Sequence, residues 1–211
     1  MISVDGIPRI IYKCIEMVDR DGLDETGIYR VCCVTSDLQK LRREYDRNQH
    51  RAEDFLSGKN VHVAANLLKL FLRELPEPLF TSTFYRDWVH AIQLADVDNQ
   101  RVALLKTFEL LHQDNRRIIL FLFDHLLRVS KHSSVNMMHL DNLAVVFGPT
   151  LMRPSKQIEQ VYYPQNSQSL NTSHLDLSTE TDQMSSELQG SMDQCRVVLA
   201  YLRLKRDGLL K

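Results

Sequence analysis

The chain has 211 residues, of which 44% are apolar and 25% are charged. This length can enclose one core without a disulfide or metal staple, and the composition excludes a fibrous or wholly disordered chain. The formal net charge of -1 argues against a protein dedicated to binding polyanions. Seven glycines and six prolines are few for this length and favour a mainly helical fold.

Cysteines and histidines give no sign of a metal site or a disulfide framework. The four cysteines lack ligand spacing and the eight histidines are scattered, so no metal is expected. Residues 1–6 do not resemble a signal peptide, and no apolar run is long enough to span a membrane. We therefore expect a cytoplasmic protein with reduced cysteines and no transmembrane segment. The sequence is compatible with its recruitment to a membrane surface together with a partner.

The first third of the chain predicts two helices separated by a loop. Apolar residues recur at helical spacing from Ile7 to Val18, and Gly22 closes this helix. Residues 22–34 lose the period and predict a loop. Thr35-Ser36-Asp37 offers capping residues to a second helix. The apolar side of that helix carries Leu38, Leu41 and Tyr45.

Residues 61–75 form the strongest helical run, which predicts a largely buried helix that Pro76 and Pro78 terminate. Its narrow polar strip has spacings of four, three and four residues, so these side chains point the same way. The strip consists of His62, Asn66, Lys69 and Arg73. Further helices are predicted at 82–93, 99–112, 115–132 and 139–147, the last ending at Gly148-Pro149. The chain therefore predicts an all-α, multi-helix bundle.

Residues 155–194 differ in composition from the rest. They are rich in Ser, Thr, Asn and Gln, with one lysine and six acidic residues, and predict a long disordered insertion before the last helix. Residues 197–204 regain helical periodicity and are expected to pack back on the bundle, which makes 1–211 a single domain. The segment carries a net charge of 1 − 6 = -5, which leaves -1 + 5 = +4 for the remaining residues.

Three polar constellations stand out from this pattern, although each has an ordinary structural explanation. Arg30 lies between apolar neighbours in Gly27-Ile28-Tyr29-Arg30-Val31, where a solvated loop arginine is the simple interpretation. The polar strip of 61–75 fits the wet side of a helix. Asn142 stands on a short apolar helix, where its amide can satisfy backbone groups.

Taken together and in this order, these segments resemble the Rho GTPase-activating (RhoGAP) domain. The resemblance is carried by residues 27–30, 66–79 and 142–151, and it extends from about Ile7 to Pro154. Within the family, residues 37–41, 79–81 and 147–151 look most like the breakpoint cluster region type. The expected fold is thus a RhoGAP-like helical bundle that lacks the family's usual N-terminal lead-in.

The resemblance implies a GTPase activator that is not itself an enzyme. Arg30 matches the family's arginine finger, which completes the active site of a Rho, Rac or Cdc-type GTPase. GTP and Mg²⁺ belong to that partner, so the chain needs no cofactor of its own. It is expected to be monomeric. The supporting residues implied are Asn66, Lys69, Arg73 and Asn142. Lys69 is expected to reach the partner, Arg73 to brace the Arg30 loop, and Asn142 to hydrogen-bond near the finger.

Departures from the family pattern keep an alternative open, chiefly Cys32-Cys33 and the missing N-terminal lead-in. Cys32-Cys33 replaces a common Ser-Gly and removes a glycine's backbone freedom, and Asn136-Met137-Met138 replaces the usual Asn-Lys-Met. The alternative is a catalytically weakened module that binds a GTPase or another protein without accelerating hydrolysis.

Other function classes find little support. No phosphate-binding glycine motif occurs. Asp124, His125 and Ser130 diverge on one predicted helix and form no hydrolytic triad. Binding of nucleic acid is not expected, because its only support is a basic cluster that a solvated helix face explains equally well. That cluster contains Lys40, Arg42, Arg43 and Arg47.

Overall fold

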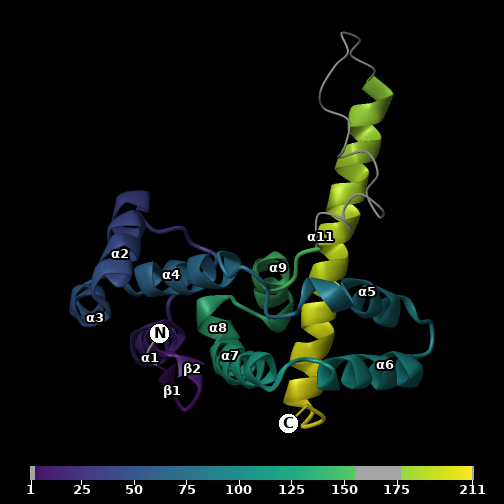
Figure 1. The fold of residues 1–211 in the computed structure, drawn as a ribbon, viewed down its shortest axis with the longest axis horizontal. Coiled ribbons are helices and arrows are strands. Elements are labelled where there is room, and N and C mark those ends of the chain that lie inside the picture. Colours follow the sequence, from purple (N-terminus) through teal and green to yellow (C-terminus); the bar gives the residue numbers. More distant parts are fainter. Residues whose placement is uncertain (1–2, 155–176, 211) are drawn as a thin grey trace.

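The computed structural model describes residues 3–154 and 177–210, and within these ranges the protein consists mainly of helices joined by short connections (Figure 1). The predicted all-α bundle is confirmed. In chain order the helices are α1 (Arg9–Asp21), α2 (Thr35–Arg47), α3 (Gln49–Ser57), α4 (Val61–Arg73), α5 (Tyr85–Gln93), α6 (Val97–Glu109), α7 (Gln113–Lys131), α8 (Ser133–Asn136), α9 (Leu140–Leu151) and α11 (Leu177–Arg206), with a 3₁₀ turn η1 at Ser82–Phe84.

A small hairpin precedes α1 and was not predicted. Strands β1 (Ser3–Val4) and β2 (Ile7–Pro8) pair antiparallel, with Val4 opposite Ile7. The turn between them has positive φ at both Asp5 (50°) and Gly6 (77°). An Asp-Gly pair favours this turn type, because both central residues must adopt the left-handed region.

Helix α4 lies at the centre of one half of the molecule, where it packs against α1, α2 and α9 (Figure 1). In the other half, the long helix α11 crosses α9, α5 and α7. Large aromatic side chains with almost no solvent exposure form part of the core. These include Phe80, Trp88, Phe123, Phe147 and Tyr201. Burial of this aromatic surface stabilises the fold.

Helix α3 and the start of α2 differ from the prediction. Among the residues of α3 whose exposure is described, Ala52 and Leu56 alone are buried, an apolar stripe too short to detect by periodicity. The helix begins where the Asn48 side chain accepts a hydrogen bond from the Arg51 amide (3.2 Å). The cap position of α2 is Val34, without a side-chain hydrogen bond, so Thr35-Ser36-Asp37 forms the first turn and does not cap it.

Helix α9 continues through Gly148 and Pro149, where the sequence predicted its end. Proline lacks the amide that would bond the carbonyl of Val145 four residues earlier. In the structure that carbonyl lies 3.9 Å from the Cys195 thiol, which is placed to donate to it. Gly148 also lets α11 approach closely, since a Cβ there would lie 2.8 Å from the Cys195 backbone nitrogen. Contacts from α11 thus allow α9 to run on to Leu151.

We expect Gly148→Ala to lower the free energy of unfolding by about 2 kcal/mol, because the added methyl group forces two helix backbones apart. Gly58→Ala is the matched control: its Cβ would meet only the Phe55 carbonyl at 4.0 Å, and its φ is not positive. That variant is expected to change stability by less than about 1 kcal/mol. Urea unfolding measures both, and equal effects would contradict the close approach of α9 and α11.

The polar segment predicted to be disordered over 155–194 ends in helix. Helix α11 begins at Leu177, and Asp193 and Gln194 are buried against the bundle, so the prediction of disorder does not hold at this end of the segment. Polar composition misled here because this part of the helix finds tertiary contacts such as Gln194 to the Tyr85 hydroxyl (3.4 Å). The remainder, 155–176, lies outside the described residues. None of the helices in the described ranges has the length and apolarity needed to cross a membrane.

Candidate functional site

Residues 22–34 form the loop predicted between α1 and α2, and we call this segment the Arg30 loop. Two residues with positive φ turn its backbone, Gly27 (70°) and Tyr29 (69°). The amides of Arg30 and Val31 both donate to the Gly27 carbonyl, at 2.8 and 2.9 Å. Ile28 and Tyr29 point inward and are fully buried, whereas Arg30 is exposed. The loop therefore presents one arginine from an anchored backbone.

Helix α4 holds the loop through its polar strip. The Lys69 ammonium donates to the Tyr29 carbonyl, and the Asn66 amide donates to the Val31 carbonyl at 2.9 Å. These bonds grip the backbone on both sides of Arg30. Burial lowers the pKa of Lys69.

The two ends of the strip behave differently. His62 lies 3.2 Å from the Glu25 carboxylate, which ties the first half of the loop to α4. The Arg73 side chain is exposed and makes no hydrogen bond or ion pair with any described residue, although its carbonyl accepts a bond from Arg153. We expected Arg73 to brace the loop and Lys69 to reach outward; in the structure it is Lys69 that contacts the loop.

Two asparagines hold the opposite side of the loop. Asn136 is fully buried, and its backbone carbonyl accepts a hydrogen bond from the Gly27 amide (2.8 Å). Its side-chain amide donates to the Leu23 carbonyl at 2.7 Å. Asn142, half-buried on α9, donates to the carbonyl of Met137 at 2.9 Å. Asn142 is thus one step removed from the loop, and Asn136, which the sequence did not single out, contacts it directly.

Beneath the loop lies a buried polar cluster that the sequence did not reveal. The Tyr29 hydroxyl lies 2.5 Å from His125 Nε2, and His125 Nδ1 lies 2.7 Å from Asp19 Oδ1. Arg128 forks onto the same carboxylate, with its closer nitrogen at 2.6 Å. A signal was present, because His125 occupies the apolar stripe of α7, where a polar residue needs a buried partner.

The partners fix the protonation of the cluster. Burial lowers the pKa of His125, and the hydrogen bond with Asp19 only partly offsets this. For Asp19, burial opposes ionisation, but hydrogen bonds from His125 and Arg128 bring its pKa below the ordinary value. Burial raises the pKa of Tyr29 well above 10.0. A neutral His125 therefore donates from Nδ1 to the Asp19 carboxylate and accepts at Nε2 from the Tyr29 hydroxyl.

This arrangement predicts a pH-dependent stability. Because the folded pKa of His125 lies below 6.5, unfolding takes up a proton as the pH falls through that value, and stability falls with it. The contribution of Asp19 is complete above 3.8 and is lost only at lower pH. Between about pH 7.5 and about pH 5, the free energy of unfolding should fall more for wild type than for His125→Gln. Urea unfolding at both pH values tests this, and parallel profiles would contradict a neutral His125.

Exposed apolar side chains occur in the Arg30 loop and on the segment that carries Asn142. Val31 and Val34 follow Arg30 in the loop, and Met137 and Val145 belong to the segment that carries Asn142; these four expose between 44% and 66% of their surface. Exposed apolar groups beside a polar centre are typical of a protein-binding surface. The nearby Cys32 and Cys33 have no positive φ, so the loop does not use the backbone freedom that a glycine would give there.

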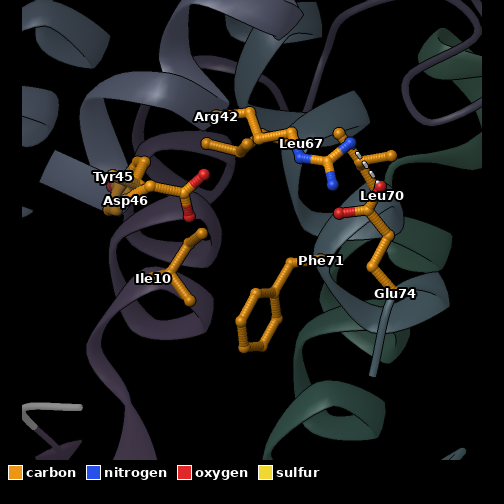
Figure 2. A pocket seen from close by; sticks show the side chains of 8 residues that line it. All are labelled: Ile10, Arg42, Tyr45, Asp46, Leu67, Leu70, Phe71 and Glu74. Carbon is orange, nitrogen blue, oxygen red and sulfur yellow. Dashed lines mark ion pairs between the residues drawn. The ribbon is translucent and has the colours of Figure 1, made fainter. Parts of the chain in front are cut away.

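A separate pocket lies between α1, α2 and α4 (Figure 2). Ile10 and Phe71 form part of its apolar floor, and an ion pair between Arg42 and Glu74 (2.8 Å) crosses it. None of the predicted site residues lines this pocket. Among the described residues, no group of three or more His, Cys, Asp or Glu side chains could hold a metal ion.

Comparison with known proteins gives consistent matches. The RhoGAP domain family model matches residues 8–156. The breakpoint cluster region protein of Homo sapiens is 40% identical over 200 residues, which is 94% of this chain and 15% of that protein. Rho GTPase-activating protein 27 of Homo sapiens is 37% identical over 158 residues, or 75% of this chain and 18% of that protein. The chain thus spans less than a fifth of these relatives.

Solved structures agree with this fold. The crystal structure of human Rho GTPase activating protein 15 matches with a TM-score of 0.71 at 27% identity, covering 98% of this chain and 85% of that one. The BH domain from GRAF, the GTPase regulator associated with focal adhesion kinase, also gives a TM-score of 0.71, at 25% identity, covering 96% of this chain and 93% of that one. From its anchored Arg30 loop, its helical bundle and these matches, the chain belongs to the RhoGAP domain family and is similar to its breakpoint cluster region members.

Proposed function

We propose that this chain activates a Rho-family small GTPase, of the Rho, Rac or Cdc type, by inserting Arg30 into the partner's active site. The observation that carries the proposal is the Arg30 loop, whose backbone is bonded on both sides while its guanidinium makes no hydrogen bond or ion pair with a described residue. GTP and Mg²⁺ belong to the partner. The chain therefore completes another protein's active site and is not an enzyme by itself.

The chemistry of GTP hydrolysis explains why an arginine is suited to this role. As the γ-phosphoryl group moves to water, negative charge spreads over its oxygens and the β–γ bridge. A guanidinium has forked donors and remains charged, so it stabilises this charge in a site from which water is excluded. Because the charge develops only in the transition state, the interaction accelerates the reaction. The attacking water is positioned by a glutamine of the partner.

The neighbouring residues have complementary roles. Lys69 and Asn66 hold the carbonyls that flank Arg30, so they support the direction of the finger. Arg73 is exposed one turn beyond Lys69 and is placed to contact an acidic partner surface. Asn142 donates a hydrogen bond to the Met137 carbonyl. Because an amide side chain both donates and accepts, Asn142 can also bond the partner's backbone.

Charge and surface character support docking on a GTPase. Outside residues 155–194 the chain carries a formal charge of -1 + 5 = +4, which favours association with an acidic partner and its phosphates. The exposed apolar side chains of the Arg30 loop and of the segment around Asn142 offer surface that can exclude water from the reacting groups.

The second candidate is a module that binds a GTPase without accelerating hydrolysis, which Cys32-Cys33 favours because it replaces a common Ser-Gly. The backbone argues against it, since neither cysteine requires a glycine-like conformation. The test is single-turnover GTP hydrolysis by purified Rho, Rac and Cdc-type GTPases, with binding measured in parallel. Acceleration of at least one GTPase supports an activator, and binding of one or more without acceleration supports the module.

A further inference from the structure

The buried cluster beneath the Arg30 loop connects three distant parts of the chain. Tyr29 belongs to the loop, His125 to α7 and Asp19 to α1, and the hydrogen bonds between them measure 2.5 and 2.7 Å. Tyr29 and His125 are completely buried. Arg128 donates to the Asp19 carboxylate, at the outer end of this series of hydrogen bonds. The loop is therefore bonded from below through a side chain as well as from its flanks through the backbone.

Tyr29 needs such support because its backbone is unfavourable. Its φ of 69° lies in the left-handed region, which costs a bulky residue about 1–2 kcal/mol. Such a conformation persists only where the surroundings fix it from several directions. The ring packs edge-on against Phe147, with centroids 5.0 Å apart, its carbonyl accepts from Lys69, and its hydroxyl donates to His125.

Arg30 follows Tyr29 directly, so the conformation of Tyr29 sets the direction in which the arginine side chain leaves the backbone. If the Tyr29 hydroxyl lost its acceptor, the ring could shift within the core and the loop could relax toward ordinary φ values. Arg30 would then spend less time where it meets the phosphates. When a change far from the reaction displaces a reacting group by about 1 Å, the rate can fall by about 100-fold.

We propose that the hydrogen bond between Tyr29 and His125, oriented by Asp19, is a positioning device for Arg30, an inference that rests on the function proposed above. Tyr29 and His125 are positioning residues because they touch neither substrate nor partner phosphates and act through the backbone of Arg30. Asp19 fixes the His125 ring by accepting from Nδ1, which leaves Nε2 to accept from Tyr29.

The test removes the hydroxyl while keeping the ring. Tyr29→Phe should lower the maximal single-turnover rate at saturating activator by about 10-fold, while the half-saturating concentration changes by less than about 2-fold. The matched control is Tyr45→Phe, since the Tyr45 hydroxyl is buried and has no hydrogen-bond partner among the described residues. It should keep the wild-type rate. Asp19→Asn, which retains an acceptor for His125, should lower the maximal rate less than Tyr29→Phe.

A double-mutant cycle separates positioning from a general structural effect. In an Arg30→Ala background, Tyr29→Phe should cause no further loss of rate, because no finger remains to be positioned. An equal loss in both backgrounds, or a rise in half-saturating concentration with an unchanged maximal rate, would overturn the inference. If Arg30→Ala is slow and Tyr29→Phe keeps the wild-type rate, only the positioning role fails. If Arg30→Ala itself keeps the wild-type rate, the proposed function fails.

Discussion

Replacing Arg30 with alanine is expected to lower the acceleration of GTP hydrolysis by about 10³- to 10⁵-fold, the range associated with an arginine finger. This corresponds to about 4–7 kcal/mol of transition-state stabilisation. The loss should be large because the backbone of the Arg30 loop holds the side chain at one point, and no second arginine lies in that loop. Single-turnover hydrolysis at saturating activator measures it.

Lysine at this position should recover little of the rate, because an ammonium lacks the forked donors that span two phosphate oxygens. The matched control is Arg101→Ala, which removes an exposed arginine on α6. It should keep the wild-type rate, and Arg30→Ala should still bind the GTPase. Wild-type acceleration by Arg30→Ala would show that the finger lies elsewhere.

Replacing Asn136 with alanine is expected to destabilise the fold by about 3 kcal/mol. The variant loses three hydrogen bonds to backbone groups in buried or partly buried surroundings, at a cost of about 1 kcal/mol each. Its amide donates to the carbonyls of Leu23 (2.7 Å) and Val129 (2.9 Å), and its Oδ1 accepts from the Met138 amide (2.8 Å).

The comparison for Asn136→Ala is Asn142→Ala, which removes one hydrogen bond at a partly exposed site. That change should cost less than about 1 kcal/mol, because water can replace the lost partner. Urea unfolding of both variants gives the difference. If the two asparagines contributed equally, the account of Asn136 as the buried support of the Arg30 loop would be wrong.

Much of the fold could be predicted because its helices carry long periodic apolar stripes. Helix α4 is the clearest example, since its buried residues and its polar strip are both evident in the sequence. The hairpin at Asp5-Gly6 and the short helix α3 were missed, because neither has a long stripe. The predicted end of α9 was wrong, because the Val145 carbonyl, which Pro149 cannot bond, contacts the Cys195 thiol. Only the folded chain provides this contact.

The residues of the proposed site come from the family resemblance, whereas their hydrogen-bonded arrangement comes from the structure alone. The family resemblance implies Arg30, Asn66, Lys69, Arg73 and Asn142 as site residues. It does not reveal that Tyr29 has a positive φ, because that conformation depends on partners far away in sequence. His125 was considered only as part of a hydrolytic triad, and its true neighbours are Tyr29 and Asp19, 96 and 106 residues away.

The central claim is that Arg30 stabilises the transition state of the partner's reaction, and a binding measurement tests it most directly. The GTPase is loaded either with a non-hydrolysable GTP analogue or with GDP and aluminium fluoride, which mimics the transferring phosphoryl group. Wild type should bind the aluminium fluoride complex at least about 100-fold more tightly than the ground-state complex, and Arg30→Ala should lose this preference. Equal preference in wild type and Arg30→Ala would contradict the claim.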